Sequence, residues 1–129
     1  MEKRVFKLKT FARWAKNLLS DDHLCIAAQE IINGRFEANL GQGLCKKRIA
    51  IVGRGKRGST RTLVAKESRL AIFYIVGRQK SDPGTDFTAT NIAQAQILGQ
   101  SLQAVCTQAL DKLVNEGVLK EICHAHPEN

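Results

Sequence analysis

The spacing of hydrophobic residues near the N-terminus predicts one short strand followed by two helices. In residues 4–9, RVFKLK, apolar and charged side chains alternate from the third position on, which is typical of a strand. After Thr10, which can cap a helix, apolar residues recur three and four positions apart, as on one helical face: Phe11, Trp14, Ala15, Leu18 and Leu19. Ser20 can cap a second helix that ends at residues 33–34, with the apolar stripe Leu24, Ala27, Ala28 and Ile31. Because almost no linker separates the two helices, we expect an antiparallel helical hairpin.

The middle of the chain changes to a pattern typical of strands. Three runs are rich in β-branched and other apolar residues: 48–52, 60–65 and 70–76. The third run is almost wholly apolar, which predicts the most buried strand. Turns at residues 53–58 and 66–69 join the three runs, and strands with such short links must run antiparallel. Asp82-Pro83-Gly84 then ends the sheet.

The last third of the chain is predicted to be mainly helical. Thr88 or Thr90 can cap a helix with one apolar face, formed by Ala95, Leu98, Leu102 and Val105. A second helical piece starts near Thr107 and stops at Gly117, and residues 118–122 fit a short edge strand. The pattern predicts an α+β fold in one domain, residues 1–122, with the helical hairpin, the antiparallel strands and a helical segment in that order along the chain. Residues 123–129 are expected to be a frayed tail.

Positive charge is concentrated in the middle of this sequence. The chain has 129 residues and a net charge of +8, and residues 46–80 hold eleven basic side chains and one acidic one. This window alone therefore carries more charge than the whole chain. A field so concentrated attracts polyanions, most simply nucleic acid. A basic surface that only aids solubility is the alternative, although scattered charge would serve solubility equally well.

Composition and the N-terminus restrict where the protein acts. No apolar run reaches the roughly 18 residues that a membrane span needs, and no secretory signal is visible at the N-terminus. We therefore expect a cytoplasmic protein that does not associate with membranes. The four cysteines are then expected to be reduced thiols: Cys25, Cys45, Cys106 and Cys123.

Several motifs fail because of their context. Residues 53–58 match G-x-G-x-x-G, but a strand follows where a dinucleotide-binding site needs a helix. Cys123, His124 and His126 lack the second matched pair that structural zinc requires, so we expect no metal and no cofactor. Glu67 is the only acid in the basic window, which weakens chemistry that depends on clustered carboxylates. A Cys–His nucleophile pair involving His23 stays an alternative at this point.

The remaining chemistry suits RNA, which carries its own nucleophile. If the 2′-OH attacks the adjacent phosphorus in line, the strand breaks to a 2′,3′-cyclic phosphate and a free 5′-OH. A protein then only needs to orient the sugar–phosphate, stabilise the phosphorane oxygens and move protons. Arginine can clamp phosphate oxygens through two parallel donors, and a lysine among other cations can act as a general acid or base.

The sequence resembles the RelE/ParE superfamily of bacterial type II toxins, especially its HigB-like branch. The most specific stretch is LGQGLCKKRIAIVGRGKRGSTRTLVA, residues 40–65, and further stretches lie at residues 4–15, 19–39, 73–82 and 97–122. The resemblance implies a small α+β fold in which an antiparallel sheet packs against the helical hairpin. It also implies ribosome-dependent cleavage of mRNA and a small antitoxin as partner. The complex of toxin and antitoxin commonly binds promoter DNA, here expected only through the antitoxin.

The resemblance also assigns roles to individual residues. Arg61 is expected to stabilise the transition state, Lys80 to transfer a proton, and Lys56 to act with them in catalysis. Contacts to RNA or the 70S ribosome are expected from six further basic residues: Lys46, Lys47, Arg48, Arg54, Arg57 and Arg78.

The sequence departs from the family pattern near the end of the apolar strand. Val76 stands where a tyrosine is expected, and Arg78 where an apolar residue is common. Tyr74, the only tyrosine, lies in an apolar run and is expected in the core. We expect an mRNA endoribonuclease toxin. Two alternatives stay open: a ParE-like inhibitor of DNA gyrase, and a catalytically inactive module that still binds RNA or antitoxin.

Overall fold

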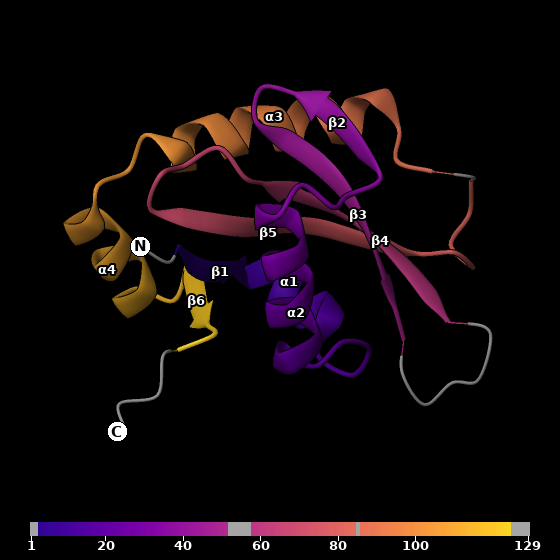
Figure 1. The fold of residues 1–129 in the computed structure, drawn as a ribbon, viewed down its shortest axis with the longest axis horizontal. Helices are drawn as coiled ribbons and strands as arrows, with labels where there is room; N and C mark the ends of the chain where they lie inside the picture. Colours follow the sequence, from indigo (N-terminus) through magenta and orange to yellow (C-terminus); the bar gives the residue numbers. More distant parts are fainter. Residues whose placement is uncertain (1–2, 52–57, 85, 125–129) are drawn as a thin grey trace.

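A six-stranded sheet with helices on both faces forms the protein (Figure 1). The computed structural model describes residues 3–51, 58–84 and 86–124. The strands are β1 (Arg4–Leu8), β2 (Ala38–Gly41), β3 (Leu44–Ala50), β4 (Ser59–Ala65), β5 (Ala71–Gln79) and β6 (Leu119–Ile122). The helices are α1 (Lys9–Ala15), α2 (Asp21–Ile32), α3 (Ala89–Gln103) and α4 (Thr107–Asn115). The α+β class expected from the sequence is confirmed.

The sheet is mixed, and its strand order is β2-β3-β4-β5-β1-β6. Strands β3, β4 and β5 run antiparallel, as their short links required. The N-terminal strand β1, however, pairs in parallel with β5, from Arg4 opposite Ala71 to Lys7 opposite Tyr74. The expectation of an antiparallel sheet is therefore only partly correct. The long connection from β1 to β5, through α1 to β4, allows these two strands to run parallel. Strand β6 occupies an edge, as predicted.

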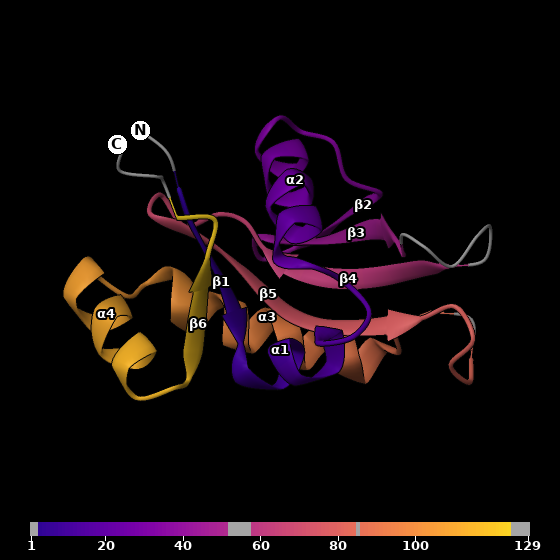
Figure 2. The same cartoon turned by 90° about the horizontal axis from the view of Figure 1, so that it is seen from below.

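The helices form two layers that cover opposite faces of the sheet, as the side view shows for α2 and α3 (Figure 2). Helices α1 and α2 pack on one face, around Phe11, Leu24 and Tyr74. Helices α3 and α4 pack on the other, around Phe73, Leu102 and Leu110. The hairpin prediction is only partly correct, since α1 lies mainly along β5 and α2 along β3.

Local capping signals place the ends of α2 and α3. The Ser20 hydroxyl accepts a hydrogen bond from the His23 amide at 3.1 Å, as expected for an N-cap. Thr88 caps α3, with Asn91 completing a reciprocal capping box. Helix α1 ends at Ala15, earlier than predicted, although Leu19 is still buried.

A close approach of helix and strand explains one glycine. The indole of Trp14 lies directly on the backbone of Gly77 in β5, where an added Cβ would sit 2.1 Å from the ring. Only glycine therefore permits this contact between α1 and β5. Trp14 also packs against Phe11 in the same layer, which agrees with its predicted place in the helical core.

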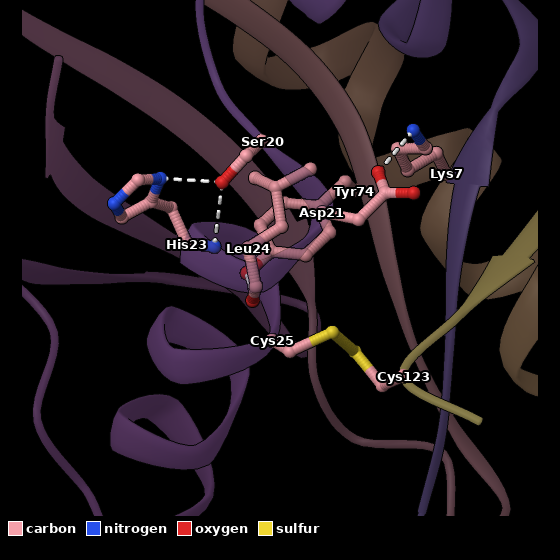
Figure 3. A network of polar contacts seen from close by, with 8 residues as sticks. All are labelled: Lys7, Ser20, Asp21, His23, Leu24, Cys25, Tyr74 and Cys123. Carbon is pink, nitrogen blue, oxygen red and sulfur yellow. Dashed lines mark hydrogen bonds and ion pairs between the residues drawn. A yellow bond between two sulfur atoms is a disulfide. The ribbon is translucent and has the colours of Figure 1, made fainter. Parts of the chain in front are cut away.

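A disulfide joins α2 to the end of β6. Cys25 and Cys123 are bonded, with their Cα atoms 5.5 Å apart (Figure 3). The prediction of four reduced thiols is therefore wrong for these two, and Cys123 is anchored to α2. Strand β6 pairs with β1, and Ile122 at its end packs in the same core as α2. This arrangement brings together two cysteines that are 98 residues apart in the sequence. Cys45 and Cys106 are free.

Among the described residues, no helix is both long and apolar enough to cross a membrane.

Candidate nucleic-acid interface

Three arginines form a row across three adjacent strands. Arg48 of β3 lies opposite Arg61 of β4, and Arg61 lies opposite Arg78 of β5. Directly opposed residues share a face of the sheet. Lys46, two residues before Arg48, lies on this face too, opposite Leu63 of the α3-side core. The sheet thus brings together basic residues that are up to 32 positions apart in the sequence.

Part of this row opens into a surface hollow of about 200 Å³. The hollow is lined by Glu37, Ala38, Lys46, Arg48, Arg61 and Asp86. Arg48 is exposed and Arg61 half-buried. Two guanidinium groups and one ammonium beside a hollow are suited to bind a phosphate, because planar guanidinium donors match its oxygens.

Asp86 partly neutralises the cations of this hollow. The Lys46 Nζ atom donates to the Asp86 carboxylate at 2.5 Å. This hydrogen bond, together with the amide of Phe87 and the charge of Arg61, lowers the pKa of Asp86 although partial burial opposes the shift. The carboxylate is therefore ionised at neutral pH and acts as a counter-ion inside the site.

Glu37 is a second carboxylate in the hollow. Its Oε1 atom accepts a hydrogen bond from the backbone amide of Arg48 at 2.6 Å. Sequence reasoning missed both acids, because Glu37 and Asp86 lie outside the basic window at 46–80. A signal for Glu37 exists in hindsight: the Gly41-Gln42-Gly43 sequence favours a tight turn, and the turn at residues 42–43 joins β2 to β3 as a hairpin. The hairpin returns the residues just before β2 to the side of β3.

Arg78 is engaged by the chain itself. Its guanidinium donates to the carbonyl oxygens of Asp82, Pro83 and Gly84, each at 3.0 Å, and to that of Asp86 at 2.8 Å. The Nε atom is buried and has no partner among the described residues. Arg78 therefore holds the loop between β5 and α3, and RNA contact by Arg78 stays a prediction.

Lys47 lies on the opposite face of the sheet. It is 6% exposed, and its ammonium pairs with Glu30 of α2 at 2.8 Å and donates to the carbonyl of Arg35 at 3.0 Å. The hydrogen bond from Lys47 lowers the pKa of Glu30. Side chains alternate along a strand, so Lys47 cannot share a surface with Lys46 and Arg48. Lys47 therefore joins α2 to β3, and RNA binding by Lys47 stays a prediction.

The remaining predicted site residues divide into two groups. Lys80 is exposed directly after β5, where its backbone amide donates to the carbonyl of Ser59 at 3.3 Å. This contact places Lys80 beside Ser59, the first residue of β4. Ser59 precedes Arg61 by two residues. Arg54, Lys56 and Arg57 lie outside the described residues.

Other reactive side chains are unsuited to catalysis here. Tyr74 is fully buried in the core, as predicted, and its hydroxyl donates to the carbonyl of Leu24 at 2.6 Å. Burial raises the pKa of this phenol, and it raises the pKa of the Cys45 thiol to about 12. Both groups therefore stay protonated.

The predicted alternatives that involve histidine or a metal can also be placed. His23 contacts the Ser20 hydroxyl at 2.5 Å, with no cysteine in that contact. Among the described residues, no three His, Cys, Asp or Glu side chains cluster as a metal site would require.

The fold and the hollow together define a small basic α+β protein with a row of arginines on the face of the sheet that α3 covers. The chain matches the family model of the RelE toxin of the RelE/RelB toxin–antitoxin system over residues 3–122. It belongs to this family, which implies an antitoxin as its partner. A search among curated proteins found no match.

Proposed function

We propose that this protein is a type II toxin of the HigB-like branch that cleaves mRNA on translating ribosomes. The 2′-OH of the RNA attacks the neighbouring phosphorus, the bond to the 5′-oxygen breaks, and a 2′,3′-cyclic phosphate remains. The RNA supplies the nucleophile, so arginine and carboxylate groups can provide the rest of the chemistry without a metal. A cognate antitoxin would cover the basic face and carry the promoter-DNA contact.

The pairing of Arg48 with Arg61 beside Glu37 is the observation that carries this proposal. Two guanidinium groups on adjacent strands can hold the two non-bridging oxygens of one phosphate. A pair of positive charges there favours the phosphorane over the ground state, because negative charge accumulates on those oxygens as the bond forms. Simple binding would not require a carboxylate beside the phosphate.

We assign proton transfer to a carboxylate that lines the hollow and to two lysines. Glu37 forms no ion pair with any described residue, and it can accept the 2′-OH proton. Asp86 is a poorer base, since its pKa is lowered by Lys46. Lys80, and Lys56 in the glycine-rich stretch, are the proposed donors that protonate the departing 5′-oxygen.

The test compares cleavage with and without ribosomes. Purified protein is mixed with a defined mRNA in EDTA, with or without programmed 70S ribosomes, and cuts are mapped by primer extension. We expect cuts only with ribosomes, and a loss of roughly 10²-fold or more in rate for Arg61→Ala and Glu37→Gln. Arg69→Ala is the matched control, because this exposed arginine lies on a turn outside the hollow.

Two outcomes would overturn the proposal. Intact mRNA in every lane, with inhibition of DNA gyrase in a parallel assay, would assign the protein to the ParE-like activity. Intact mRNA with retained RNA or antitoxin binding would define a catalytically inactive module. Val76 in place of the family's tyrosine makes this second outcome worth measuring directly.

A further inference from the structure

A second basic hollow, larger than the first, lies on the face of the sheet that carries α1. Its volume is about 470 Å³, and it lies between α1, the segment that leads into α2, and strand β6. The lining residues are Lys7, Ala12, Arg13, Lys16, Leu19, Ser20, Asp21 and Lys120. Four of these eight residues are cations and one is an acid.

Lys7 and Lys120 form the strand side of the hollow. They are directly opposed in the β1–β6 ladder, so both side chains lie on the same face. The Lys7 side chain is only 9% exposed, and its ammonium donates to Asp21 at 2.7 Å (Figure 3). A lysine buried to this extent is normally paired with a negative charge. Asp21 neutralises the charge of Lys7 and pairs with none of the other cations of the hollow that the structure describes.

The other cations of this hollow have no counter-ion within the part of the chain that the structure describes. Arg13, Lys16 and Lys120 are exposed, and none forms an ion pair with a described residue. Like charges gathered around one concavity repel each other and raise the local concentration of anions. Packing does not require this arrangement, because the side chains of Arg13 and Lys16 face solvent.

We infer that this hollow is a second phosphate site, which binds the sugar–phosphate backbone of RNA. A protein partner would need apolar anchors at the centre of its interface. The large exposed apolar side chains that the structure describes are Ile26, Ile32, Ile97, Leu98 and Val118, and none of them lines the hollow. Its exposed groups are cationic, which suits a phosphate chain read by charge and not by sequence.

The second site binds RNA independently of the proposed cleavage. It lies on the α1 side near β6, whereas the arginine row lies on the α3 side across β3, β4 and β5. One phosphate cannot reach both hollows. The second hollow therefore holds either a separate segment of the same RNA or a neighbouring structured RNA, such as ribosomal RNA. Both sources present the same phosphodiester chemistry.

The experiment measures RNA affinity without any cleavage. Binding of a fluorescent RNA hairpin that resists cleavage through 2′-O-methyl groups is titrated at several salt concentrations. We expect the double variant Arg13→Ala/Lys16→Ala to lose roughly tenfold in affinity at 0.1 M salt, and its log–log salt slope to fall by about 1 to 2. Lys112→Ala, an exposed lysine on α4, is the charge control and should change neither quantity beyond experimental error.

An affinity and a salt slope of the double variant equal to those of the control would overturn the inference. Weaker capture of the cognate antitoxin by the double variant, with RNA affinity unchanged, would assign the hollow to an acidic protein segment instead. A single-stranded RNA is compared with 70S ribosomes, and a larger effect on ribosomes would identify structured ribosomal RNA as the source. Arg61→Ala cleavage data, obtained separately, report on the first site alone.

Discussion

At the scale of single residues, Asp86 controls how much positive charge the first hollow presents. Its carboxylate binds Lys46 and interacts with the charge of Arg61. A phosphate that enters the hollow must compete with this internal anion. The same reasoning explains why a count of basic residues overestimates the free positive charge of the site. Two of its basic residues, Lys46 and Arg78, are already bound by the chain.

Replacement of Asp86 should therefore strengthen RNA binding. We expect Asp86→Asn to raise the affinity for RNA roughly threefold to tenfold. The substitution removes the negative charge that pairs with Lys46, and this leaves the lysine free to bind phosphate. Fluorescence anisotropy at low and moderate salt measures the change. Glu116→Gln removes the same charge from the exposed end of α4 and serves as the control. Equal gains in both variants would mean that only net charge matters.

Gly77 offers a residue-scale test of packing. Gly77→Ala places a methyl group within 2.1 Å of the Trp14 ring, and overpacking of this kind costs about 1–3 kcal/mol in unfolding free energy. Urea denaturation measures the loss. The double variant Trp14→Leu/Gly77→Ala should lose less than the sum of the two single variants, because the smaller side chain removes the clash. Additive losses would show that the ring does not cause the restriction.

At the scale of secondary structure, the elements with strong local signals were predicted well. The apolar residues on one face of α2 and the apolar residues of β5 predict these elements without knowledge of the tertiary structure. Strand β2 was missed because four residues, ANLG, carry no alternating pattern, and pairing with β3 alone makes them a strand. The start of β3 was missed because Lys46 and Lys47 look like a loop, although each binds a carboxylate on its own face.

The disulfide between α2 and the end of β6 allows a test of stability at the scale of secondary structure. Removal of the bond by Cys25→Ser/Cys123→Ser should lower the unfolding free energy by about 2–4 kcal/mol, because it releases a loop of 98 residues in the unfolded chain. Guanidinium denaturation with and without reductant measures this loss. Cys106→Ser, at an exposed free thiol, should keep the full sensitivity to reductant. Four reactive thiols in the unreduced, denatured protein would contradict the bond.

At the scale of the whole molecule, the class of fold followed from the order of elements, but the candidate site did not. Hydrophobic periodicity shows which residues are buried, and it says nothing about which strand β1 joins. Glu37 and Asp86 reach the arginine row through a hairpin and a loop, so only the assembled sheet makes them neighbours of Arg61. The charge window predicted the region of the site and missed its acids.

The ends of the chain are joined by charge, which makes the stability of the whole fold sensitive to acid. Arg4 of β1 donates to both carboxylate oxygens of Glu121 in β6 at 2.8 Å and also pairs with Asp111 of α4. The hydrogen bonds from Arg4 lower the pKa of Glu121 below its ordinary value of 4.5, although burial opposes the shift. A carboxyl with a lowered folded pKa stabilises the fold above its unfolded pKa. That contribution is lost as the pH falls through the folded value.

We therefore expect the unfolding free energy to decrease as the pH is lowered from about 4.5. Glu121→Gln should make the protein less stable at pH 7 and make this decrease shallower, because the amide cannot be protonated and no longer neutralises Arg4. Urea denaturation at a series of pH values between 7 and 3 measures both effects. Glu116→Gln, which alters a carboxylate without an ion pair among the described residues, should keep the wild-type slope. If both variants follow the wild-type curve, Arg4 and Glu121 do not couple the two ends of the chain in solution.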